Sequence, residues 1–107
     1  MTTEDFVRNL KAEKERLLDS YFSGSEQTAV GTLARQLATG AEATAAVRRL
    51  LDLALTDAFY TILLGLDGCT SLGDAIQQSY QIRSEDGSDI TAGGGELEAL
   101  AYEHFQI

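Results

Sequence analysis

The stretch that decides the fold is LLDLALTDAFYTILLGL, residues 50–66. Apolar side chains occupy almost every position around the helix that this stretch forms, and a helix of that kind is surrounded by other elements in a globular protein. The helix is expected to begin earlier, at Ala41 or Glu42, because the helix breaker Gly40 comes directly before them. We therefore predict one long helix from about residue 41 to Leu66 at the centre of the fold.

Two shorter helices are predicted before the long helix, and a fourth at the C-terminal end. The first begins at Thr2 or Thr3, where a hydroxyl can cap the helix and two acidic residues follow. Residues 23–25 (SGS) end it, and the last of these serines is the expected N-cap of the second helix, with Gly40 as its left-handed C-cap. The C-terminal helix follows Gly95. The apolar residues that recur at helical spacing are Phe6, Val7, Leu10, Leu17, Leu18, Tyr21 and Phe22 in the first helix, Val30, Leu33, Ala34, Leu37 and Ala38 in the second, and Leu97, Leu100, Ala101 and Phe105 in the last.

Between the long helix and the last one, the apolar periodicity changes from that of a helix to that of a strand. In IQQSYQIR, residues 76–83, apolar side chains alternate with polar ones. The β-favouring residues Ile90 and Thr91 follow the turn signal Asp86-Gly87. Alternation on both sides of such a signal predicts a β-hairpin.

The loop of this hairpin determines which side chains share a face. A three-residue loop at residues 85–87 places Ile82 opposite Ile90, whereas a two-residue loop puts the two isoleucines on opposite faces. We therefore favour the three-residue loop, with Gly87 in the left-handed position of a bulged turn. The predicted fold class is α+β: three N-terminal helices with the third one long and central, a β-hairpin and a short C-terminal helix, in a single globular domain over residues 1–107.

The formal net charge of −9 is distributed unevenly along the chain. Residues 1–49 hold seven basic and seven acidic residues, whereas residues 50–107 hold ten acidic residues and a single basic one, Arg83. An acidic surface repels phosphate backbones and anionic lipid, so neither a nucleic-acid partner nor a membrane partner is expected. The expected partner is a protein with a basic surface, and a homodimer is left open.

Cysteine content and hydropathy favour a cytoplasmic location. Cys69 is the sole cysteine, so no internal disulfide can form. The longest uncharged run in the apolar centre covers residues 58–66, well short of the ~20 residues that a membrane span needs. The N-terminal residues include Glu4 and Asp5 and lack the apolar run of a secretory signal, so no such signal is expected.

The loop SEDGSDITAGGGE, residues 84–96, has the composition of an ion-binding loop but not the required spacing. A calcium-binding EF-hand loop that begins at Asp86 needs oxygen ligands at its fifth and twelfth positions and glycine at its sixth. The sequence has Ile90, Leu97 and Thr91 there. No metal site is predicted in this loop.

The three glycines at residues 93–95 likewise lack the context of a phosphate-binding loop. Such a loop requires a lysine directly after its last glycine, and here Glu96 follows. A carboxylate at this place repels phosphate, so no cofactor is predicted and the segment is interpreted as a connection to the last helix.

The residue types that most often carry catalysis are few, and we predict no catalytic residue. His104 is the sole histidine and falls in the last turn of the C-terminal helix, where the helix dipole favours an imidazole. Cys69 follows Asp67, and acidic neighbours raise the pKa of a thiol. Asp57 and Asp67 are the carboxylates embedded in apolar sequence. We expect the first to act as a cap or to pair with an arginine such as Arg48 or Arg83, and the second to end the long helix.

The leading hypothesis is a non-enzymatic protein-binding module, of the inhibitor or immunity type, whose acidic C-terminal surface contacts a basic partner. The predicted contact residues are the acids Glu85, Asp86 and Asp89 of the loop, together with Tyr80 and Tyr102. Tyrosine is enriched at protein interfaces because it combines a large apolar ring with a hydroxyl.

Two other classes of function remain open. One is a small enzyme or ligand-binding domain with a pocket between the central helix and the hairpin, using Asp57, Asp67, Tyr60 or His104. The other is a self-associating structural protein that pairs through the hairpin edge or the alanine-rich second helix. The stretch TILLGLDG, residues 61–68, followed by SLG, resembles small bacterial proteins, and this resemblance implies no residue role and no activity.

Overall fold

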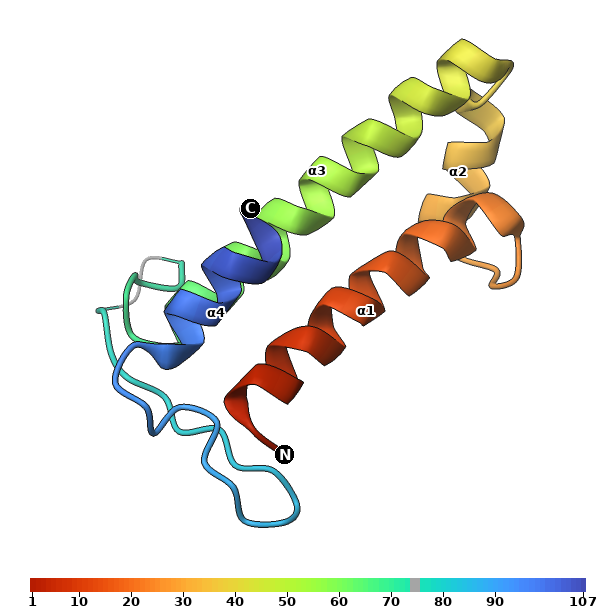
Figure 1. Ribbon diagram of the computed structural model, residues 1–107. Helices are drawn as coiled ribbons and strands as arrows, with labels where there is room; N and C mark the ends of the chain where they lie inside the picture. Colours follow the sequence, from red (N-terminus) through yellow and green to blue (C-terminus); the bar gives the residue numbers. More distant parts are fainter. Residues whose placement is uncertain (74–75) are drawn as a thin grey trace. The chain divides into compact units, whose positions relative to one another are not determined.

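The computed structural model describes residues 1–73 and 76–107, and four helices lie within these ranges (Figure 1). They are α1 (Thr3–Ser23), α2 (Ala29–Leu37), α3 (Ala41–Leu66) and α4 (Glu96–Phe105). The predicted starts and ends of the first, third and fourth helices are confirmed to within a residue or two. These helices were predictable because their caps and apolar spacing are local features of the chain.

The second helix is shorter than predicted at both ends. Thr28, not Ser25, is the N-cap of α2, and its hydroxyl accepts a hydrogen bond from the Gly31 amide at 3.0 Å. The C-cap is Ala38, whose amide donates to the Ala34 carbonyl at 3.0 Å, so Gly40 does not cap this helix. Thr28 stands directly before the first residue of α2, so its hydroxyl can reach an amide of the first turn, whereas Ser25 is three residues further away.

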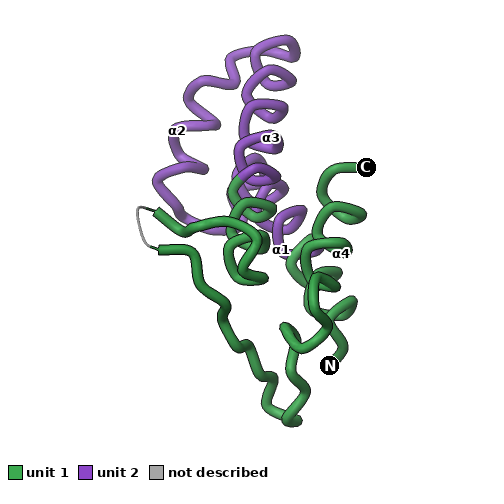
Figure 2. The backbone as a smooth tube through the Cα atoms, turned by 90° about the vertical axis from the view of Figure 1, so that its left-hand side faces the viewer, with its two compact units in different colours: residues 1–11, 58–107 green, residues 12–57 purple. Residues whose placement is uncertain are grey.

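The chain forms two compact units, shown in different colours in Figure 2. Unit 1 consists of residues 1–11 and 58–107, and unit 2 consists of residues 12–57. The helices α1 and α3 contribute residues to both units, whereas α2 belongs to unit 2 and α4 to unit 1.

The core of unit 1 is built from the start of α1, the end of α3, α4 and the loop before α4. Phe59 of α3 and Phe105 of α4 meet edge to face, with ring centroids 6.1 Å apart. The Thr3 hydroxyl donates a buried hydrogen bond of 2.8 Å to the Ile90 carbonyl and so ties the loop to α1. The buried residues of this core are Val7, Leu63, Ile90, Leu97, Ala101 and Phe105.

Unit 2 contains a buried ammonium group where the apolar stripe of α1 is interrupted. The Lys14 side chain is 3% exposed, and its Nζ lies 2.7 Å from Asp52 Oδ1 on α3. Nearby, α2 approaches α1 closely at the buried glycine Gly31, and Arg35 donates to the Tyr21 carbonyl at 3.0 Å. Unit 2 therefore combines a small apolar core with polar ties between its helices.

The predicted α+β fold class is wrong, because the described residues contain no β-strand and the predicted β-hairpin is absent. The segment instead makes one isolated antiparallel bridge, between Arg83 and Asp89. A two-stranded ladder is marginal by itself, and here serine, threonine and aspartate side chains bond to the backbone in place of a ladder. The Thr91 hydroxyl, for example, accepts a hydrogen bond from the Ile82 amide at 3.2 Å.

The turn within this segment nevertheless has the pairing that the three-residue loop predicts. The Ile90 amide donates to the Ile82 carbonyl at 2.8 Å, and Gly87 has a φ of 90°. Ile90 is buried in the core of unit 1, and Ile82 packs against that core. The apolar pair thus determines the register of the turn although the pairing does not continue into strands.

The long helix α3 is present, but the prediction that it is central is wrong. Its buried residues are Leu63 and Gly65, near its C-terminal end. Leu50 is 66% exposed and Leu53 is 48% exposed. Within unit 2, α3 is tied to α1 by the ion pairs of Lys14 with Asp52 and of Arg48 with Asp19. None of the helices in the described residues is long and apolar enough to cross a membrane.

Candidate functional site

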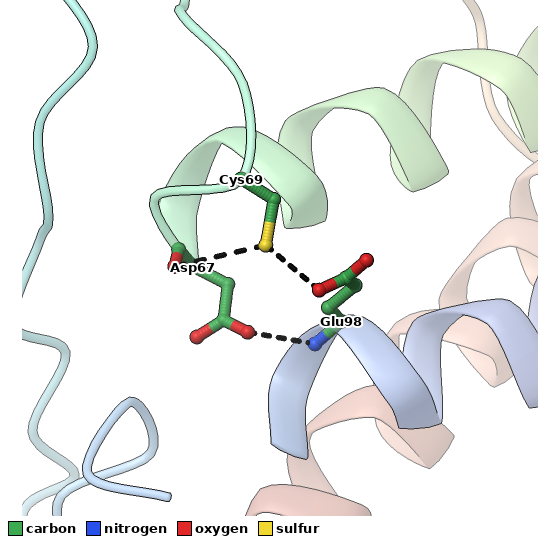
Figure 3. Close-up of side chains that lie close together, drawn as sticks. All are labelled: Asp67, Cys69 and Glu98. Atoms are coloured by element: carbon green, nitrogen blue, oxygen red, sulfur yellow. Dashed lines mark hydrogen bonds between the residues drawn. The ribbon is translucent and has the colours of Figure 1, made fainter. Parts of the chain in front are cut away.

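Three side chains with metal-ligating or reactive groups meet in unit 1: Asp67, Cys69 and Glu98 (Figure 3). The Cys69 thiol donates to Glu98 Oε2 at 2.9 Å, and the Glu98 amide donates to Asp67 Oδ2 at 3.0 Å. The sulfur and one carboxylate oxygen from each acid lie within 4.8 Å of one another.

The local sequence explains how the loop after α3 reaches the start of α4. Gly68, with a φ of 78°, turns the chain at the end of α3, and the Cys69 amide closes the helix on the Leu64 carbonyl at 3.0 Å. At the other side, the N-cap of α4 is Gly95, which has no side chain to accept a hydrogen bond. Asp67 supplies the missing acceptor from another part of the chain, and its negative charge suits the positive end of the helix dipole.

The chemistry of this cluster is that of a helix cap with a protonated thiol. The hydrogen bond to Glu98, some desolvation and the negative charges of Glu98 and Asp67 raise the pKa of Cys69 to about 11. A thiol with this pKa carries a proton at neutral pH, and both nucleophilic attack and metal ligation require the thiolate. The sulfur and the two carboxylates are the residues that would hold a metal ion here, but their mutual hydrogen bonds already account for their proximity.

Sequence reasoning considered two of these residues separately, predicted neither as a site residue, and did not consider the third. Asp67 was expected to end the long helix, and Cys69 was expected to be unreactive beside an acid. Glu98 carried no such signal, because 29 residues separate it from Cys69 and a first-turn glutamate is ordinary in a helix.

Two of the predicted partner-binding acids are engaged in hydrogen bonds within unit 1. Asp86 accepts from the Met1 amino group and from the Ser84 hydroxyl, and it accepts from the Ser88 amide at 2.9 Å. These hydrogen bonds, that of the amino group first, hold the pKa of Asp86 well below its ordinary value. Asp89 accepts from the amide and the hydroxyl of Thr91 at 3.0 and 2.9 Å. Both acids therefore shape the loop.

The other three predicted partner-binding residues differ in exposure. Glu85 is exposed, and Tyr80 is half-buried. Tyr102 is 52% exposed and lies on the outer side of α4. The exposed residues of α4 fall on one side of the helix at 100° per residue. We call this surface the acidic face of α4, and its residues are Glu96, Glu98, Ala99, Tyr102 and Glu103, together with the C-cap residue Gln106.

Two cavities of unit 1 do not gather the residues considered for an enzyme. A cavity of about 240 Å³ has a wholly apolar lining: Phe6, Leu10, Phe59, Ile62, Leu63 and Leu66. A surface hollow of about 370 Å³ is lined by Met1 and residues 84–86. Asp57, Asp67, Tyr60 and His104 are absent from both linings.

Comparison of the chain with protein-family models, curated proteins and solved structures gives no match. The function is therefore argued from the residues of this chain alone.

Proposed function

We propose that this protein is a non-enzymatic protein-binding module that uses the acidic face of α4 to contact a basic surface of another protein. The observation that supports this proposal is the uncompensated negative charge around an exposed tyrosine. Glu96, Glu98 and Glu103 form no ion pair with a basic side chain in the part of the chain that the structure describes.

Three acids of unit 2 that are paired with arginine provide the contrast. Arg16 lies 2.6 Å from Glu13 and 2.5 Å from Glu26, and Arg48 lies 2.6 Å from Asp19. Carboxylates paired in this way attract a further cation less strongly, because the neighbouring guanidinium already offsets part of their charge. The acidic face of α4 keeps its full charge, so it attracts a basic surface over roughly a Debye length, about 8–10 Å at ordinary salt.

Tyr102 adds a large aromatic side chain to this face, which can make an apolar contact that the carboxylates cannot make. It projects from the same side of α4 as Glu98 and Glu103 and is half exposed. An aromatic side chain that becomes buried at the centre of an interface contributes about 2 kcal/mol or more to binding. Because α4 is a regular helix of ten residues, it offers this group with little loss of conformational entropy.

The proposed partner is a folded protein with clustered lysine or arginine side chains. The loop acid Glu85 adds charge near the turn, whereas Asp86 and Asp89 act mainly by holding the loop in place. We place the direct contacts on Tyr102 and on the carboxylates of α4.

The test compares two charge variants of equal net charge. Glu96→Gln with Glu103→Gln removes two charges from the acidic face of α4, and Glu13→Gln with Glu26→Gln removes two charges that are ion-paired with Arg16. Immobilised wild-type protein captures candidates from an extract of the source cells, and each captured protein is identified, purified and titrated by calorimetry. We expect the α4 variant to weaken binding about tenfold or more and the control variant to change it less than about threefold.

Two further measurements make the proposal falsifiable. The affinity of the purified partner should fall about tenfold between about 50 and 300 mM salt, and Tyr102→Ala should lower it by a similar factor. A purified partner whose affinity is the same at both salt concentrations and in the α4 variant contradicts the proposal.

A further inference from the structure

One face of α3 in unit 2 leaves apolar side chains in water. Ala46, Leu50, Leu53 and Asp57 follow one another at spacings of four, three and four residues, and all four are exposed. This spacing places them in a single row along the helix, as in the contact row of a coiled coil. Leu50 is 66% exposed and Leu53 is 48% exposed, so the middle of this row is its most apolar part.

We propose that this row is the contact surface for a second copy of the same chain, with the two α3 helices antiparallel. The occupant is inferred from the charges at the row. Arg49 borders the row near its N-terminal end, and Asp57 closes its C-terminal end. Neither residue has an ion-pair partner among the described residues.

The orientation follows from where Asp57 lies. In a parallel pair the two Asp57 side chains face each other across the contact, and like charges at that distance repel. In an antiparallel pair centred between Leu50 and Leu53, each Leu50 faces Leu53 of the other copy and each Asp57 faces Ala46. Arg49 of one copy then lies about 4.5 Å along the axis from Asp57 of the other, at 1.5 Å per residue, which its side chain can span.

A twofold pair of this kind is self-complementary. One cation and one anion on each copy produce two equivalent intermolecular ion pairs, which is the property of an isologous dimer interface. An unrelated apolar partner would bury Leu50 and Leu53, but it would leave the charges of Arg49 and Asp57 without a counter-ion at the edge of a contact from which water is excluded. The row therefore suits a second copy of this chain better than an arbitrary hydrophobic surface.

The size of the row predicts a weak dimer. Two exposed leucines and the alanines beside them bury less than the ~1,200 Å² of a standard interface. We expect a dissociation constant of about 10–100 µM, so the equilibrium depends on protein concentration. This association uses unit 2 and is independent of the partner proposed for α4 in unit 1.

Sedimentation velocity at about 5 and 500 µM protein tests the proposal. Wild-type protein is expected to shift from monomer toward dimer over this range, and Leu50→Asp is expected to stay monomeric. The matched control is Leu37→Asp on α2, whose side chain is 54% exposed and lies outside the row. Circular dichroism checks that both variants keep their helices, which exposed positions permit. A wild-type monomer at the high concentration, or equal losses in both variants, overturns the proposal.

Substitutions of the charged pair test the orientation. Asp57→Asn removes a favourable pair from an antiparallel dimer and weakens it, whereas it relieves repulsion in a parallel dimer and strengthens it. Arg49→Glu and Asp57→Arg should each weaken association about fivefold, and the double variant should recover most of the loss. A stronger dimer with Asp57→Asn, or no recovery in the double variant, overturns the antiparallel arrangement.

Discussion

The buried ammonium of Lys14 leads to a prediction whose size can be worked out from the structure. Its Nζ donates to Asp52 Oδ1 at 2.7 Å and to the Thr56 hydroxyl at 3.2 Å, and Glu15 lies 3.2 Å away. Burial by itself lowers the pKa of Lys14, but the hydrogen bonds and charges of Asp52 and Glu15 outweigh it, so the net effect raises the pKa. Lys14 is therefore a charged group held in unit 2 by its partners.

The perturbation is Asp52→Asn, which keeps the shape of the side chain and removes its charge. A hydrogen bond to a charged group contributes about 1.5–3 kcal/mol to stability. The Asp52 side chain is 44% exposed, so water screens part of this interaction. We expect the free energy of unfolding to fall by about 1–2 kcal/mol, since the ammonium stays buried with a weaker acceptor.

Two control variants separate this effect from a general loss of charge. Asp19→Asn breaks the ion pair between Asp19 and Arg48, in which the Asp19 side chain is 69% exposed and the Arg48 side chain is 43% exposed. This variant should lower the free energy of unfolding by less than about 0.5 kcal/mol. Lys14→Met removes the buried charge and keeps an unbranched apolar chain. Its cost should be below about 1 kcal/mol, because Asp52 can then be solvated.

Urea unfolding followed by circular dichroism measures all three variants. The slopes of the transitions should agree, so that a shift in midpoint reports stability. The raised pKa implies that the ammonium contributes fully below its ordinary value of 10.5 and that this contribution is lost as the pH rises through the raised value. If Asp52→Asn costs no more than Asp19→Asn, the argument that Lys14 is a buried charge held by Asp52 is refuted.

Two further predictions concern unit 1. The rate at which Cys69 reacts with a disulfide reagent should rise with pH, with a midpoint near 11. Glu98→Gln should move this midpoint down toward 9.0, because the raised pKa originates mainly in the Glu98 hydrogen bond. The same midpoint in the variant as in the wild type would contradict this assignment. Thr3→Val leaves the Ile90 carbonyl buried without its donor and should lower the free energy of unfolding by about 1–3 kcal/mol in urea unfolding. The control is the exposed hydrogen bond that the Thr44 hydroxyl donates to the Gly40 carbonyl. Thr44→Val should lower the free energy of unfolding by well under half of the loss in Thr3→Val.

The candidate site was only partly predictable, and the reason lies in sequence separation. The effect of Asp67 on Cys69 follows from two neighbouring residues, so the direction of the thiol pKa was expected. The capping of α4 by Asp67 joins residues 31 positions apart, and no local rule predicts which carboxylate reaches which helix. The same holds for Asp86 and Asp89: composition identified them as acidic, but their turn hydrogen bonds emerged only from the folded loop.

The sequence by itself determined those features that depend on a few consecutive residues. The long helix up to Leu66, the short last helix and the register of Ile82 with Ile90 all follow from periodicity and turn residues, whose energies are local. The concentration of negative charge in residues 50–107 is likewise a property of the sequence.

Only the tertiary structure decided which of these residues are buried. Leucine is usually buried and lysine usually exposed, but here Leu50 is 66% exposed and the Lys14 side chain is 3% exposed. Burial depends on which elements pack together, and in unit 2 the segments beside α3 cover only part of its apolar surface. The expected hairpin is absent for a different reason: alternation favours a strand, but a ladder of two strands is marginal by itself, and here side chains such as that of Thr91 bond to the backbone in its place.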